Sequence, residues 1–368
     1  LRLDDRANAT AARDSGFVIA PGQPDESELI ARIVSKDEDE VMPPPLSNKH
    51  VSPEQAALLR RWIAEGAAYQ KHWAFVPPVR AALPGSGSQL SALNSQLSAN
   101  PIDRFVLARL ARENLAPSRP AAPETWLRRA GFDLVGLPPT PADLDAFVAD
   151  VAKRGEPAYA AAADRLLASP HFGERQAIEW LDAARYADTH GFNNDSSRTM
   201  WRWRDWVIEA FNANLPYDRF ITEQIAGDLL PDAELRSTNS DLPSARLEAR
   251  IATGFARNHV INSEGGIIDE EYRVEYVADR VRTLSTAWLG LTMECAKCHD
   301  HKFDPIRQKD YFQMFAFFNS VPEFGEDGRV ANAIPMIPAP TRAQQTALAD
   351  QRRRLDTLDA TLAAARSA

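Results

Sequence analysis

Both cysteines of the 368-residue chain lie in one pentapeptide, Cys295-Ala296-Lys297-Cys298-His299. The spacing C-x-x-C-H is the attachment signature of a c-type haem. Two thiols three residues apart on a helical turn can each form a thioether with one edge of a porphyrin, and the histidine that follows can supply the proximal ligand of the iron. The pattern therefore predicts one covalent haem c in this chain, with His299 as the iron ligand and Cys295 and Cys298 as the attachment points.

Three other interpretations of the pentapeptide stay open at this stage. A thioredoxin-like redox pair sits between a strand and a helix, but the run 278–289 before the motif has a helical pattern. A structural zinc site needs four ligands, and with no second cysteine pair it would depend on His301 plus a distant residue. A plain disulfide would ignore His299 and would be strained at this spacing. Haem is the favoured interpretation.

The composition is that of a globular protein, with 44% apolar and 25% charged residues. The length allows two or three domains. A formal net charge of −9 and the lack of a long basic block argue against a nucleic-acid partner. No run of eighteen or more apolar residues occurs, so no membrane span is predicted. The expected partners are redox proteins, and the sequence leaves the oligomeric state open.

The two ends of the chain suggest a piece of a longer protein. The first residues are charged and lack the apolar core of a signal peptide. Covalent haem attachment takes place outside the cytoplasm, so we expect a periplasmic or otherwise exported protein whose signal lies upstream. The pattern over 344–366 also looks like a helix that is cut off in mid-course.

The periodicity predicts a mainly α protein, because alternating strand patterns are nearly absent. We expect a partial cytochrome c-like helical module, followed by a larger helical c-type haem domain. The predicted boundaries are 1–75 for the partial module, 76–100 for a linker rich in Pro, Ser, Gly and Gln, 101–325 for the larger domain, and 326–368 for a second linker and a C-terminal helix.

Several stretches of the larger domain resemble a known family. They include Gly131-Phe132-Asp133-Leu134-Val135-Gly136-Leu137-Pro138-Pro139-Thr140, Ala184-Arg185-Tyr186-Ala187-Asp188-Thr189, Trp203-Arg204-Asp205-Trp206-Val207-Ile208, and the run 289–305 around the pentapeptide. Over roughly 100–325 the chain is similar to planctomycete-type cytochrome c proteins, in the domain of unknown function numbered 1549. The resemblance implies export and haem binding, and it implies no substrate.

Residues 1–75 resemble the tail of the planctomycete cytochrome c module that commonly precedes this domain. In such modules a methionine before a proline-rich loop supplies a thioether to the iron, as Met42-Pro43-Pro44-Pro45 would here. The resemblance thus implies that Met42 ligates a second haem in the full-length protein, whose attachment motif would lie before Leu1. The competing interpretation is an ordinary loop methionine.

The sixth ligand of the first haem is less defined by the sequence. His259 is the best distal candidate, with His190, Met200 or an open position as alternatives. His301 is too close to His299 to reach the opposite face and is expected beside the haem or its propionates. Arg204 is a candidate partner of the propionates, because its fork geometry suits carboxylates; an ordinary surface arginine is the alternative.

These patterns favour electron transfer as the function. The main rival is a haem-dependent oxidoreductase of unknown substrate, such as a carbohydrate, with a pocket among Asp188, His190, Arg204 and Glu264. A binding or scaffold protein with a structural haem is the third possibility.

Overall fold

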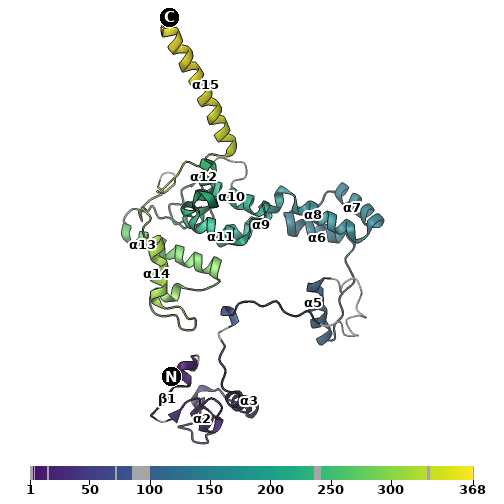
Figure 1. Cartoon of the computed structure of the whole chain (residues 1–368), viewed down its shortest axis with the longest axis vertical. Helices are drawn as coiled ribbons and strands as arrows, with labels where there is room; N and C mark the ends of the chain where they lie inside the picture. The colour runs from purple at the N-terminus through teal and green to yellow at the C-terminus, as the bar shows by residue number, and fades with distance from the viewer. Residues whose placement is uncertain are drawn as a thin grey trace. The chain divides into compact units, whose positions relative to one another are not determined.

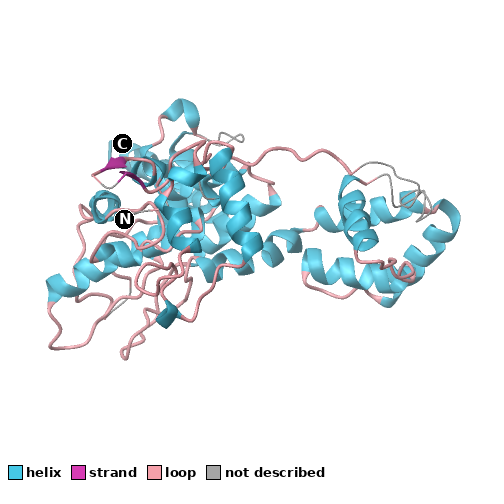
Figure 2. Cartoon of the chain, turned by 90° about the horizontal axis from the view of Figure 1, so that it is seen from below, coloured by secondary structure: helices cyan, strands magenta, loops and turns pink. Residues whose placement is uncertain are grey.

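The computed structural model describes residues 3, 5–14, 16–70, 73–84, 100–235, 242–329 and 332–367, and these residues are mainly helical (Figure 2). The predicted fold class is confirmed at this level. The sheet found in these residues is a two-stranded antiparallel pair, β1 (Ala12–Arg13) and β2 (Gly16–Phe17). Two compact units are present, Leu1–Ser118 and Arg119–Ala368. Most of the predicted linker, residues 85–99, lies outside the described residues, so its boundaries stay a prediction.

The first unit is a small helical body with one apolar cluster. Ile30 of α2 and Ile63 of α3 are buried in it together with Ala9 and Ile19. Ser52 caps α3 in a capping box, as its position before a proline predicts. The helices in the described residues of this unit are α1 (Arg6–Ala9), α2 (Glu28–Val34), α3 (Pro53–Ala64) and α5 (Pro101–Arg112), with single 3-10 turns η1 (Pro24–Glu26), η2 (Pro45–Ser47) and η3 (Trp73–Phe75).

The second unit begins with three helices that pack together, α6 (Pro123–Val135), α7 (Pro141–Arg154) and α8 (Glu156–Leu167) (Figure 1). Each has a proline in its first turn, where the missing N–H costs nothing. Leu127 and Phe147 are buried between them, and Phe147 packs on the ring of Tyr159 with centroids 5.3 Å apart.

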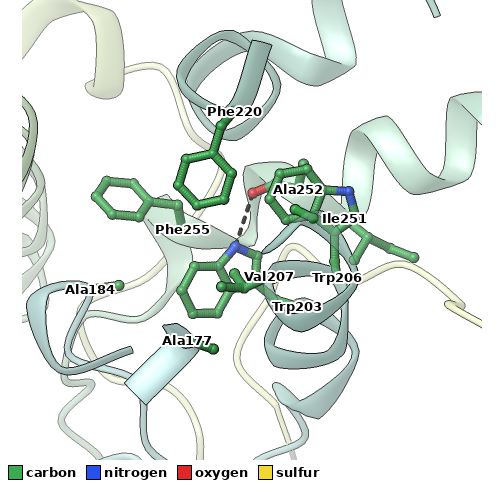
Figure 3. Close-up of a cluster of buried hydrophobic side chains, with 10 residues drawn as sticks. Ala177, Ala184, Trp203, Trp206, Val207, Phe220, Ile251, Ala252 and Phe255 are labelled. Atoms are coloured by element: carbon green, nitrogen blue, oxygen red, sulfur yellow. Dashed lines mark hydrogen bonds between the residues drawn. The ribbon is translucent and has the colours of Figure 1, made fainter. Parts of the chain in front are cut away.

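An aromatic core follows, built by α9 (Pro170–Ala183), α10 (Trp201–Asn212), α11 (Tyr217–Ala226) and α12 (Leu242–Ala252). The 3-10 turns η5 (Gly227–Leu229) and η6 (Asp232–Glu234) lie between α11 and α12, and η7 (Thr253–Arg257) follows α12. Figure 3 shows Trp203 and Trp206 among Phe220 and Phe255, with the Trp203 indole donating to the Ala252 carbonyl at 3.1 Å. Buried indoles need such a partner, because an unpaired N–H in an apolar core is costly.

Gly173 lets α9 and α10 approach closely. A Cβ at this position would lie 2.3 Å from the Ile208 carbonyl oxygen, which belongs to the backbone of α10. We expect Gly173→Ala to lower the free energy of unfolding by roughly 2–3 kcal/mol, because the two helices must move apart. Gly265→Ala is the control: nothing lies within 4 Å of its Cβ position, and the expected change is within about 0.5 kcal/mol. Urea unfolding followed by tryptophan fluorescence measures both, and equal midpoints would refute the close approach.

The last part of the unit carries the pentapeptide. The helix α13 (Asp269–Leu284) continues into a π turn, η8 (Ser285–Leu289), whose Trp288 ring lies 5.4 Å from the Phe255 ring centroid. After η9 (Glu294–Lys297), α14 (Gln308–Phe318) packs on α13. Trp288 therefore fixes the start of the pentapeptide segment to the aromatic core. The final helix is α15 (Arg342–Ser367). Among the described residues, no helix is both long enough and apolar enough to cross a membrane.

Candidate functional site

The first three residues of the pentapeptide lie in a single 3-10 turn. Glu294–Lys297 is η9, and Cys298 is its C-terminal cap. Side chains three residues apart eclipse one another in a 3-10 helix, so Cys295 and Cys298 lie on the same side of the turn. Both cysteines are exposed and both are free thiols.

The two residues between the cysteines anchor the turn. Ala296 is fully buried and packs in a cluster with Val281 of α13, Met293 and Tyr311 of α14. Lys297 Nζ forms an ion pair with Glu275 Oε1 of α13 at 2.7 Å. Because the inner face of the turn is held in this way, its two thiols face outward on a fixed support.

His299 is exposed and has one defined tautomer. Its Nδ1 lies 2.8 Å from the Asp300 carbonyl oxygen. A carbonyl oxygen can only accept, so this hydrogen bond places a proton on Nδ1, and in the neutral ring the lone pair is on Nε2. Metal-ligating histidines show this arrangement, in which a bond from one ring nitrogen fixes the ring and leaves the other for the metal.

The segment after His299 is held to the N-terminus of α14. The Asp300 carboxylate accepts from the Gln308 backbone N–H at 2.8 Å, and the Gln308 amide donates to the Lys297 carbonyl at 3.2 Å. His301 Nδ1 accepts from the backbone N–H groups of Phe303 and Asp304, at 3.3 and 2.8 Å. The His301 ring thus supports the loop that follows the proposed iron ligand, and its predicted place beside the haem or its propionates stays a prediction.

The donor set fits a covalent haem better than the alternatives. No group of three or more His, Cys, Asp or Glu side chains able to hold a metal is found in the described residues, which argues against zinc. The two thiols are free rather than joined, and no strand precedes the turn as in a thioredoxin-like unit. Two exposed aromatic side chains follow the motif in sequence, with Phe303 83% and Phe317 81% exposed. The residues present therefore fit haem c: two exposed thiols and one imidazole whose Nδ1 is held by a backbone carbonyl.

Tyr311 lies beneath the turn and is 1% exposed. Burial is the main cause that raises the pKa of Tyr311 to about 12, and the nearby Glu275, Glu294 and Cys298 add to it. The hydroxyl therefore stays protonated near Cys298.

His259, the predicted distal ligand, lies in a buried polar network. It is 1% exposed, and its Nε2 lies 2.6 Å from Arg280 Nη2 while its Nδ1 lies 3.0 Å from the Val260 carbonyl oxygen. The arginine can only donate and the carbonyl can only accept, so the ring is neutral with its proton on Nδ1. Its role as an iron ligand stays a prediction, and in the structure both ring nitrogens have protein partners.

This network should make stability depend on pH. Burial, followed by the charges of Arg280 and Arg257, holds the pKa of His259 well below its usual 6.5. Below pH 6.5 the imidazole binds a proton in the unfolded chain but stays neutral in the folded chain. The contribution of His259 to the free energy of unfolding is therefore fully present above pH 6.5 and is lost as the pH falls below it. The largest slope for one such group is about 1.4 kcal/mol per pH unit. In haem-free protein we expect His259→Gln to flatten the change in unfolding free energy between pH 7.5 and 5.5.

The matched control for this experiment is His50→Gln, because His50 is exposed. Chemical unfolding at each pH gives the slopes. If His259→Gln and His50→Gln give the same slope as the unaltered chain, the buried neutral imidazole is not the source of the pH dependence.

Two other predicted site residues, Arg204 and Met42, lie outside the pentapeptide and outside the His259 network. Arg204, on α10, donates to the carboxylate of its neighbour Asp205 at 2.8 Å. Met42 is 41% exposed in the first unit, and its backbone N–H donates to the Arg32 carbonyl. The predicted contacts of Arg204 with propionates and of Met42 with a second iron stay predictions.

Two residues of the predicted substrate pocket have defined surroundings. His190 is 1% exposed and has Gly328 packed directly against its ring. Asp188 accepts from the Tyr186 hydroxyl at 2.6 Å. Burial of His190 at this level leaves its ring out of contact with solvent.

The sequence interpretation missed the buried ion pair at the centre of the polar network. Arg280 of α13 is 2% exposed and Glu323 is 6% exposed, and they pair through two hydrogen bonds. One signal was available: Arg280 lies on the same helical face as Val277 and Val281, which are fully buried. A charge on an apolar face indicates a buried partner.

Comparison with known proteins gives two family matches. Residues 101–323 match the family described as protein of unknown function (DUF1549), and residues 1–45 match the family described as planctomycete cytochrome C. No curated protein and no solved structure match the chain. The first match spans more than half of the chain, so the protein belongs to the DUF1549 family of unknown function, with a planctomycete cytochrome C segment at its start.

Proposed function

We propose that this chain is an exported c-type haem protein that transfers electrons, with one covalent haem c on the η9 turn. The relation of its first 45 residues to planctomycete cytochrome C supports this class of function. The observation that carries the proposal is the arrangement of Cys295, Cys298 and His299: two free, exposed thiols on one side of an anchored turn, followed by an imidazole with its Nε2 lone pair available.

In this function the chain holds and orients the cofactor. Cys295 and Cys298 supply the two thioether sulfurs, and His299 Nε2 is the proximal ligand. When bound, the haem supplies a one-electron iron couple. The anchored turn keeps the ligand in place, because Ala296 is buried and the Asp300 carbonyl holds the ring orientation through Nδ1.

The further ligands belong to the same proposal. His259 remains the proposed sixth ligand. In that role its Nε2 has to give up the hydrogen bond from Arg280 before it can bind iron. Arg204 and His301 remain the proposed partners of the propionates. Met42 is the proposed ligand of a second haem in the full-length protein, which would act with the first as a relay towards redox partner proteins.

Absorption spectroscopy of protein matured in a bacterial periplasm tests the function. A pyridine haemochrome spectrum establishes covalent haem, and spectra of the oxidised and reduced forms give the spin state. If the protein transfers electrons, we expect a low-spin, six-coordinate haem that binds neither cyanide nor peroxide. A high-spin haem that binds cyanide would contradict the relay and favour the oxidoreductase.

The His259→Gln variant, measured in the same way, tests the sixth ligand. Loss of the low-spin spectrum is expected if this imidazole reaches the iron, since glutamine is a poor ligand of haem iron. An unchanged spectrum would exclude His259 as the sixth ligand and would not affect the assignment of His299 as the proximal ligand.

A further inference from the structure

The helix α15 carries a leucine stripe that faces solvent. Leu348, Leu355 and Leu362 are seven residues apart, and Leu358 lies three residues after Leu355. All four side chains are about half exposed or more: Leu348 53%, Leu355 58%, Leu358 64% and Leu362 49%. This is the a and d spacing of a coiled coil, with the first three leucines at a and Leu358 at d.

The rest of the described chain leaves this stripe uncovered. Figure 1 shows α15 extending away from the other helices of the Arg119–Ala368 unit. A hydrogen bond from Ser244 Oγ to Gln345 Oε1 at 3.0 Å ties its first turn to α12. Isolated helices are marginal in water, and most helices are stabilised by packing of their apolar face. We therefore expect the leucine stripe of this 26-residue helix to pack against a partner.

The charges beside the stripe indicate what that partner is. In this heptad register Arg354 occupies position g and Asp359 position e. No ion pair involves either residue within the part of the chain that the structure describes, whereas Arg353, on the outer face, pairs with Asp350. In a parallel two-stranded coil, each g residue faces the e residue five positions later on the other chain. Arg354 would then face Asp359 of a second copy, twice by symmetry.

The layers inside the coil agree with this orientation. A parallel, in-register pair places leucine on leucine at 348, 355, 358 and 362, and Gln351 on Gln351. An antiparallel pair would set Gln351 against Leu362. A polar residue matched with itself at one core layer fixes register, so the sequence favours the parallel arrangement.

We propose that α15 is a self-association segment, through which two copies of this chain form a parallel two-stranded coiled coil over residues 348–365. The occupant of the leucine stripe is the same stripe of a second copy. The proposal is independent of the haem site.

Light scattering coupled to size-exclusion chromatography tests this on the full chain. The expected mass is about twice the 40.8 kDa of one polypeptide. The double variant Leu355→Asp/Leu358→Asp should elute at the mass of one chain. Ala360→Asp, which places the same charge on the outer face at position f, should remain dimeric. A single-chain mass for the unaltered protein, or a dimer unaffected by the double variant, would overturn the proposal.

Charge reversal tests the pairing itself. Asp359→Arg should weaken dimerisation by about tenfold or more, since two attractive pairs become repulsive. Adding Arg354→Asp to it should restore the dissociation constant, as sedimentation equilibrium measures. Failure of this second change to restore the dimer would overturn the parallel pairing.

Discussion

Replacing Glu323 with alanine is expected to lower the free energy of unfolding by about 3–5 kcal/mol, because the change leaves buried arginines without their carboxylate. Arg280 is 2% exposed, and Arg257 donates to Glu323 Oε2 at 2.6 Å. An uncompensated buried charge costs far more than the pair itself contributes. We therefore expect a large loss of stability from a single side chain that lies far from the pentapeptide in sequence.

The position of Glu323 explains the size of this effect. Its carboxylate accepts from Arg280 of α13 and from Arg257 of η7, and it lies 3.7 Å from His259 Nε2. Arg280 Nε also donates to the Ala256 carbonyl at 2.9 Å. One carboxylate thus connects α13, the η7 turn and the segment after α14, and its removal loosens all three.

Denaturant unfolding followed by circular dichroism measures the loss. Glu326→Ala is the matched control, because Glu326 pairs with Arg329 at 2.8 Å while both side chains are largely exposed, at 40% and 65%. Exposed pairs contribute roughly 0–1 kcal/mol. If the two variants lower the unfolding free energy equally, the buried network does not stabilise the fold as described.

The second large effect is the loss of covalent haem. The double variant Cys295→Ser/Cys298→Ser is expected to carry none, since serine cannot form the thioether and no other cysteine is present in the chain. Each single variant should retain one thioether and a reduced amount of bound haem. Haem staining of a denaturing gel, after expression with the maturation machinery, measures the attached fraction.

Lys302→Gln is the control for the haem experiment. Lys302 is exposed and follows the pentapeptide without belonging to it, so this variant should stain like the unaltered protein. Haem that survives denaturation in the double variant would show attachment elsewhere and contradict the assigned cysteines.

The helical part of the fold could be predicted from local sequence. The sequence pattern over Trp201 to Asn212 predicts a helix, and α10 agrees with it. The pattern over Lys309 to Asn319 predicts another, and α14 agrees with it to within a residue at each end. Proline at N1, capping serine or threonine and apolar periodicity are local signals, and they specify these elements without knowledge of the tertiary structure.

The site could be predicted only in part. The pentapeptide is a contiguous motif, so its chemistry is readable from five residues. The network of Arg257, His259, Arg280 and Glu323 is not contiguous, and its members meet only when α13 packs against the η7 turn. The sequence favours His259 by its residue type and by its place beside a glycine turn. What the sequence could not supply was its partner, because that partner depends on packing rather than on spacing.

The most direct test of a haem-bearing η9 turn is the intact mass of the matured protein under denaturing conditions. The mass should exceed that of the polypeptide by one haem, and the excess should stay on the peptide that contains residues 295–299 after proteolysis. A mass equal to the bare polypeptide, from cells that attach haem to a known c-type cytochrome in parallel, would contradict the account.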